Sequence, residues 1–286
     1  MLASPVVRKP SERRRSVLGL LVLWLASACT TVPSRPPAPT DIPGNRLENP
    51  GFESGRTGWS YRDKSRHWQD FEIVSEPTRS GRGAVRLHLK RVPDDPPKSV
   101  LVAGVVQSLG PTGIPEKVTG WYRVDRWEKA SERTALYLQF VAILKGDPRT
   151  AQLVYPLDPS RGKTLNNYQL RYYLVGLEQA PFDVENARSQ FIVKGSPVLD
   201  EWVRFEIPLR ADFERLWGQP QQYHQLDLLF EARWDHKPEG SAVHADVYYD
   251  DLYLGPAPTP APVVRSGSSD GAPRVDPVRI RRPGEE

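Results

Sequence analysis

The stretch Val85-Arg86-Leu87-His88-Leu89-Lys90 alternates strictly between apolar and polar side chains. Successive side chains of a β-strand point to opposite faces, so this pattern predicts a strand with one buried face. Further runs with a period of two residues occur at 118–124, 136–140, 168–175, 202–209, 226–234 and 247–254. Turn-forming clusters separate them, and helical spacing with good helix formers is found at 211–217. The sequence therefore predicts an all-β fold built as an antiparallel β-sandwich.

The first 28 residues have the order of a secretory signal peptide: basic residues, a short apolar run, then small residues before Cys29. The run is too short for a transmembrane helix, which needs roughly 20 residues. The end, Leu-Ala-Ser-Ala-Cys, resembles the lipobox of bacterial lipoproteins, although Leu25 stands one place further from the cysteine than usual. The resemblance implies a lipid on Cys29 that anchors the chain in the cell envelope, and Thr30 favours the outer membrane. The alternative is an ordinary secretory peptide cut near Ala28, with an incidental cysteine.

Two flanks are rich in proline and lack apolar periodicity, so they cannot bury enough surface to offset chain entropy. We expect a tether over 29–44, a disordered Pro/Arg-rich tail over 256–286 and one folded region over 45–255. The formal net charge of +4 owes much to the leader and the tail. The folded part is close to neutral, so nucleic-acid binding is not expected. The chain has one cysteine, which leaves no partner for an internal disulfide.

Three stretches of the folded region carry a family resemblance. The opening reads LENPGFESG at 47–55, a middle stretch reads SGRGAVRL at 80–87, and the ending reads VYYDDLYL at 247–254. They are similar to the start, the early hairpin and the last strand of galactose-binding-like jelly rolls, above all carbohydrate-binding modules of families four, nine and twenty-two. The resemblance implies a jelly-roll β-sandwich with its first and last segments side by side. A stretch at about 145–199 exceeds the usual length of these modules and is interpreted as an insertion.

The same resemblance implies a structural calcium ion. In relatives the ion is held by the glutamate of the Gly-Phe-Glu run, a main-chain carbonyl and an aspartate of the terminal pair, which here match Glu53 and either Asp250 or Asp251. Calcium takes six to eight oxygen ligands. Strand parity places Asp250 on the inward face with Leu252 and Asp251 on the outward face, and an inward carboxylate requires a cation or several donors. The alternative is that Asp250 accepts main-chain N–H groups without a metal. No organic cofactor is expected.

A sugar-binding face needs exposed aromatic rings that stack on sugars, beside side chains that bond hydroxyl groups. Parity directs such residues outward on three predicted strands, and the charged loop at 125–129 offers one more tryptophan. The alternative for each is ordinary packing, since Tyr and Trp are common strand residues. Trp59 and Trp121 are expected in the core. The candidate residues are Tyr137, Gln139, Arg171, Tyr173, Glu231, Arg233 and Trp127.

These observations favour a non-catalytic, lipid-anchored and monomeric envelope protein that binds a polysaccharide or another glycan. The alternative is an envelope protein that binds a protein partner or the cell wall, with the insertion as the contacting part. Jelly rolls also occur as glycoside hydrolases and lyases. The five histidines show no H-E-x-x-H spacing, however, and the predicted folded region over 45–255 has no G-x-S-x-G elbow. An enzyme acting on polysaccharides is therefore the less favoured class.

Overall fold

The computed structural model describes residues 42–256, except 62–67, 93–99, 130–133, 148, 150–153, 155–165, 180–182, 221 and 236–241. Cys29, the predicted signal peptide and most of both predicted flanks lie outside the described residues. Within the part that is described, no helix reaches the length and apolarity needed to cross a bilayer.

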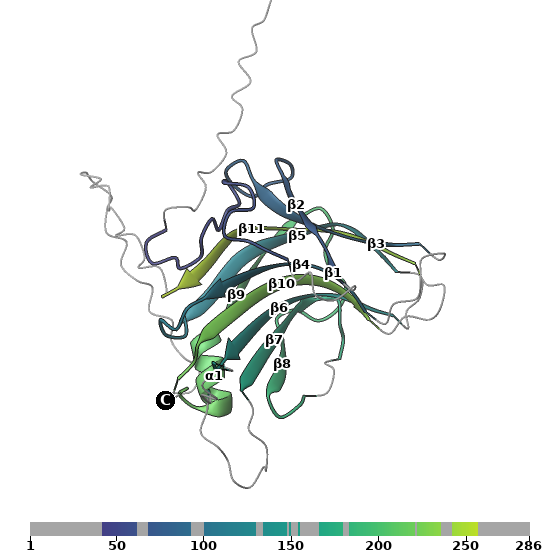
Figure 1. Ribbon diagram of the computed structural model, residues 1–286. Coiled ribbons are helices and arrows are strands. Elements are labelled where there is room, and N and C mark those ends of the chain that lie inside the picture. Colours follow the sequence, from purple (N-terminus) through teal and green to yellow (C-terminus); the bar gives the residue numbers. More distant parts are fainter. Residues whose placement is uncertain are drawn as a thin grey trace, which may run out of the picture. The chain divides into compact units, whose positions relative to one another are not determined.

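Two β-sheets dominate the described chain (Figure 1). The six-stranded sheet has the order β1-β4-β10-β6-β7-β8, and the five-stranded sheet has the order β2-β3-β11-β5-β9. Neighbouring strands run antiparallel, except for the parallel pairs β1 with β4 and β7 with β8. The predicted all-β antiparallel jelly-roll sandwich is confirmed. The elements are β1 (Trp68–Gln69), β2 (Phe71–Val74), β3 (Ala84–Arg91), β4 (Val100–Leu109), β5 (Lys117–Lys129), β6 (Ala135–Lys145), β7 (Asn167–Val175), β8 (Ala187–Phe191), β9 (Trp202–Ile207), α1 (Leu209–Trp217), β10 (Gln225–Asp235) and β11 (Val243–Gly255).

The hydrophobic core lies between the inner faces of the two sheets. Val85, Leu87 and Leu89 of β3 are fully buried, as the alternating pattern predicts. The ring of Phe230 in β10 lies 6.2 Å from that of Phe205 in β9 and 5.5 Å from that of Tyr249 in β11, measured between centroids. Aromatic contacts of this kind join the six-stranded sheet to the five-stranded sheet.

The opening segment lies beside the last strand, as the resemblance implies. The Asn45 side chain donates to the Leu252 carbonyl at 3.0 Å and accepts from the Leu254 amide at 3.0 Å. The Arg46 amide donates to the Leu254 carbonyl at 2.8 Å. One asparagine therefore holds together segments that are more than two hundred residues apart in the chain.

The stretch interpreted as an insertion contributes two strands to the six-stranded sheet. Strand β7 pairs with β6, and β8 pairs with β7 at the edge of the sheet. Leu170, Tyr172 and Leu174 of β7 belong to the main core. The Tyr172 hydroxyl donates to Asp212 in α1 at 2.9 Å. This part of the chain is thus built into the sandwich.

Two tryptophans expected in the core have different environments. Trp59 is buried and packs on Phe52, with ring centroids 5.2 Å apart. Trp121 is half-buried on the other side of β5 from the buried Tyr122, and the Arg79 guanidinium lies 4.4 Å from its ring centroid. The expectation for Trp121 was wrong because the odd positions of this strand up to Arg123, before its bulge, point away from the core.

Candidate functional site

The outer face of each sheet is the side turned away from the shared core. On the six-stranded sheet, register places Glu231 opposite Gln139, and Gln139 opposite Tyr173. Arg233 lies opposite Tyr137, and Arg171 lies two residues before Tyr173 on β7, opposite Val141. The structure therefore brings together six of the seven candidate residues on this outer face.

Four of these residues are not exposed, contrary to the expectation. Tyr137, Gln139 and Glu231 each retain 3% of their accessible surface, and Tyr173 retains 1%. The two tyrosine rings meet edge to face with centroids 5.3 Å apart, and the Gln139 amide donates to the Glu231 carboxylate. Strand parity identifies the face on which a side chain lies, but it does not report how deeply that face is buried.

The arginine at the edge of this group is held in place by a chain of hydrogen bonds. The Tyr137 hydroxyl donates to Asp235 Oδ2 at 2.6 Å, and Arg233 Nε donates to the same carboxylate at 3.1 Å. Burial raises the pKa of the Tyr137 phenol well above its usual range, so it remains a donor. Burial alone would lower the pKa of Arg233, but Tyr137, Asp235 and Glu231 raise it overall. The Arg233 side chain is 31% exposed, and its guanidinium is a fixed cation at this surface.

Trp68 belongs to the same outer face, and the sequence analysis missed it. It packs on a second apolar cluster of Val106, Val141, Ile143 and Leu229, separate from the core. Its ring occupies the space over Gly104, where an added Cβ would lie 2.9 Å from Trp68 Cζ3. Strand β1 has two residues, too short to show a period, so the sequence offered no strand signal here.

Trp127, the seventh candidate, lies apart from the others on β5 of the five-stranded sheet. It is half-buried against the main core, and a Cβ on Gly176 would lie 2.9 Å from its ring. The prediction of an exposed anchor was wrong, because residues 125–129 continue strand β5 instead of forming a loop.

The residues proposed for calcium surround the turn at 79–83. Glu53 Oε1 accepts from the amides of Arg82 and Gly83 at 2.7 and 3.0 Å. Asp250 Oδ2 accepts from the amides of Arg79 and Ser80 at 2.8 and 3.3 Å. Main-chain donors thus satisfy both carboxylates, which is the geometry of the alternative without a metal.

Asp250 and Asp251 sit at a bulge that reverses the parity argument. Asp250 is register-paired with Trp121 and so lies on the outer face, whereas Leu252 on the far side of the bulge is in the core. Asp251 has a positive φ of 52° and accepts from the Ser80 hydroxyl. Asp250 is nevertheless fully buried. Burial, followed by the charge of Asp251, raises the pKa of Asp250 to about 7.

Within the described ranges, three or more metal-ligating side chains come together at one place, which does not involve Glu53, Asp250 or Asp251. The group consists of His88, His244 and Asp246 on the outer face of the five-stranded sheet. Neither histidine was predicted as a ligand, since the pairing of β3 with β11 joins residues more than 150 positions apart.

No protein-family model matches the chain, and no curated protein matches it at a significant level. Among solved structures, it is similar to the module TmCBM61 in complex with β-1,4-galactotriose, with 13% identity, 73% of this chain and 97% of that chain covered, and a TM-score of 0.36. It is also similar to CBM28, described as a carbohydrate-binding module specific for non-crystalline cellulose, with 14% identity, coverages of 75% and 98%, and a TM-score of 0.36. A third is the enzymatically active domain of tailspike protein 4 of bacteriophage CBA120, with 8% identity, coverages of 74% and 21%, and a TM-score of 0.38. At these identities and scores, no ligand or activity transfers to this chain.

Proposed function

We propose that the protein is a non-catalytic, lipid-anchored envelope protein that binds a glycan chain across the outer face of its six-stranded sheet. The supporting observation is one row of residues that crosses all six strands. Trp68 lies beside Val102, Val102 beside Arg233, and Arg233 beside Tyr137. The row continues on β7 with Tyr173, which lies opposite Gln139 and packs on the Tyr137 ring, and on β8 with Phe191, which lies beside Tyr173. At strand spacings of about 4.8 Å the row is about 24 Å long, which suits several sugar rings.

The half-buried members of the row supply the contacts in this proposal. Trp68 and Phe191 offer aromatic rings for stacking, and Arg233 and Arg171 offer donors to hydroxyl oxygens. The buried Tyr137, Gln139, Tyr173 and Glu231 position these side chains. Stacking of one ring contributes roughly 1 kcal/mol, so the affinity is weak and spread over subsites.

The glycan site is tested by two changes at Trp68. Trp68→Ala removes the ring, and Gly104→Ala places a methyl group 2.9 Å from both the Trp68 ring and the main-chain oxygen of Phe230. Both variants are expected to weaken glycan binding severalfold in affinity electrophoresis against plant, algal and bacterial polysaccharides. Gly110→Ala is the matched control, because no atom lies within 4 Å of its added Cβ. If the Trp68 and Gly104 variants bind glycans as well as the Gly110→Ala control and the parent do, Trp68 is not part of the glycan site. New reducing ends or unsaturated products in parallel assays would favour an enzyme.

Anchoring through Cys29 is tested separately. The protein is expected in the membrane fraction, at the outer membrane, and Cys29→Ser is expected to release it in soluble form. Mass spectrometry of the parent should detect the lipid. A soluble parent without lipid would contradict the anchor and leave the glycan proposal standing.

Interaction with a protein partner is the second candidate. Four of the five large hydrophobic side chains exposed among the described residues lie between positions 184 and 199, and they are Val184, Val193, Val198 and Leu199. Recovery of a partner in pull-downs, lost when these residues are changed to serine, together with silence across the glycan panel, would favour this function.

A further inference from the structure

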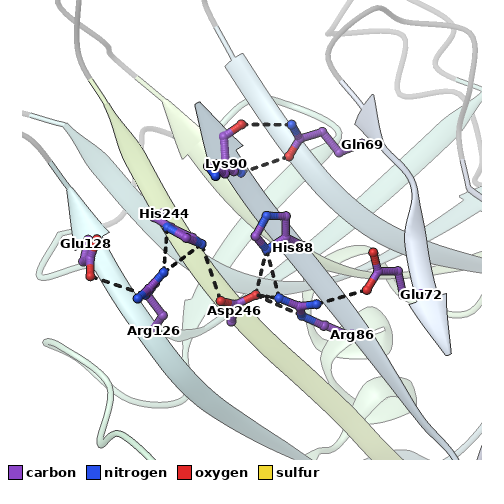
Figure 2. A network of polar contacts seen from close by, with 9 residues as sticks. All are labelled: Gln69, Glu72, Arg86, His88, Lys90, Arg126, Glu128, His244 and Asp246. Carbon is purple, nitrogen blue, oxygen red and sulfur yellow. Dashed lines mark hydrogen bonds and ion pairs between the residues drawn. The ribbon is translucent and has the colours of Figure 1, made fainter. Parts of the chain in front are cut away.

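A compact group of two imidazoles and one carboxylate lies on the outer face of the five-stranded sheet (Figure 2). Asp246 Oδ1 lies 2.7 Å from His88 Nδ1, and Asp246 Oδ2 lies 3.6 Å from His244 Nε2. The two imidazole rings meet edge to face with centroids 5.1 Å apart. One ligand atom from each residue lies within 4.8 Å of the others.

Strand register builds this group on a rigid surface. His88 of β3 lies directly opposite Asp246 of β11, and His244 lies two residues before Asp246 on the same face. The side chains of His88, His244 and Asp246 remain 32%, 20% and 12% exposed, so an ion can reach them from solvent. A cavity of about 340 Å³ borders His244 and is lined also by Lys90 and Glu128.

We propose that His88, His244 and Asp246 bind a divalent transition-metal ion of the zinc class. Neutral imidazole nitrogens and a carboxylate oxygen are ordinary zinc ligands, and three protein ligands leave a fourth position for water or a bound ligand. Calcium and magnesium prefer sets composed of oxygens alone, so this donor set selects against them.

Charged side chains of both signs surround the group. Arg86, Lys90 and Arg126 stand near Glu72 and Glu128, as Figure 2 shows, and Arg91 and Lys129 line the cavity beside His244. Arg86 donates to Asp246 Oδ1, which leaves Oδ2 facing His244.

Two arginines compete with the ion: Arg86 Nη2 lies 3.3 Å from His88 Nδ1, and Arg126 contacts the His244 ring. Arg126 Nη1 lies 3.0 Å from His244 Nδ1 and 3.3 Å from Nε2. When Nδ1 accepts from Arg126, the ring proton sits on Nε2. Metal binding at Nε2 moves this proton to Nδ1, so the hydrogen bond from Arg126 to Nδ1 is lost. Arg126 keeps its ion pair with Glu128, whose Oε1 lies 3.4 Å from Arg126 Nε.

The test uses metal-free protein without a histidine tag, titrated with zinc chloride in a calorimeter. One ion per chain is expected, with a rise in melting temperature at saturating zinc, because an ion that binds the folded state stabilises it. Cobalt(II) is the second probe, and a tetrahedral site should give intense absorption bands in the visible range. Absence of heat and of any melting shift would overturn the proposal, as would equal binding of calcium or binding of phosphate in place of zinc.

Variants locate the site. His88→Ala and His244→Ala should each weaken zinc binding at least tenfold, since loss of outer-sphere partners alone costs 10- to 100-fold at known sites. His224→Ala, which changes an exposed histidine before β10, is the matched control and should bind as the parent does. Arg126→Ala should tighten binding severalfold, because it removes both a cation and the donor that competes at His244. Circular dichroism confirms folding of each variant, and tight binding that survives both ligand variants would refute the assignment.

Discussion

The outer face of the six-stranded sheet is buried along its middle strands. The outer face of the five-stranded sheet, called the open face below, is charged and partly exposed on β3, β5 and β9, although Asp246, Tyr248 and Asp250 on its central strand β11 are buried. Tyr173 and Leu229 on the first face retain 1% and 2% of their surface, while the side chains of Arg86 and His88 on the second are 29% and 32% exposed. Both faces come from strands in which side chains alternate. The difference teaches that the kind of residue on the outward positions, in addition to their period, determines whether a face is buried.

The largest expected effect comes from truncating the buried outer face. Tyr173→Ala removes a ring that packs on Tyr137 and Phe191, at centroid distances of 5.3 and 5.5 Å. We expect a loss of about 3 kcal/mol in the free energy of unfolding, as for other buried aromatic side chains, measured by urea denaturation. Arg204→Ala, on the exposed side of β9, should stay within about 0.5 kcal/mol. A loss below about 1 kcal/mol for Tyr173→Ala would mean that this face is open in solution.

The two faces also show how far the sequence could predict this protein. Local alternation predicted most of the strands and the inward side of β3, and helical spacing predicted α1 to within two residues at its start. The apolar run at 141–144 in β6 was a readable sign of burial on both faces, which attention to alternation alone passed over. The bulge at Asp250 and the meeting of His88 with Asp246 depend on pairing between distant segments, so no local pattern contains them.

Calcium binding bears on the comparison at Asp250, which is fully buried on the outer face of the five-stranded sheet. If Glu53 and Asp250 share a calcium ion in addition to their main-chain donors, the ion stabilises the protein, since a cation offsets the repulsion between Asp250 and Asp251. The gain is about 2.7 kcal/mol when free calcium is a hundredfold above its dissociation constant. Chelation should then lower the melting temperature, and Asp250→Asn should abolish the response, while Glu206→Gln retains it. An unchanged melting curve in chelator would mean that no calcium is bound and that main-chain N–H groups alone stabilise these carboxylates.

A smaller effect concerns the polar pair inside the buried face. Gln139→Leu keeps a similar volume but removes the amide that donates to Glu231. Loss of a hydrogen bond to a buried carboxylate is expected to cost about 2 kcal/mol of unfolding free energy. Glu72→Gln alters a carboxylate 58% exposed on the open face, where the ion pair with Arg86 contributes at most about 1 kcal/mol. If the two changes lower the free energy of unfolding equally, polar contacts on the buried face contribute no more to stability than those on the open face.

The smallest expected effect is a dependence on pH that distinguishes a buried carboxylate from an exposed one. Asp227 lies on the outer face of the six-stranded sheet and retains 4% of its surface. Burial alone would raise its pKa, but hydrogen bonds from Gln225, Lys145 and Ser108 lower it overall. Because the folded pKa lies below the unfolded value of about 3.9, Asp227 stabilises the fold above that pH, and the contribution is lost as the pH falls through the folded pKa.

Asp227→Asn should therefore cost about 1 kcal/mol in urea unfolding at pH 6, and the difference from the parent should shrink as the pH falls below about 4. Glu206 on the open face also has a lowered pKa. The hydrogen bond from Lys117 lowers this pKa, burial raises it by less, and Arg204 lowers it further. Its carboxylate is 46% exposed, so solvent screens these interactions, and Glu206→Gln should change stability by less than about 0.5 kcal/mol at either pH. If the cost of Asp227→Asn is the same at pH 3 and pH 6, the effect comes from packing and not from ionisation. The two faces would then differ in how deeply their carboxylates are buried, but not in how much the ionisation of those carboxylates contributes to stability.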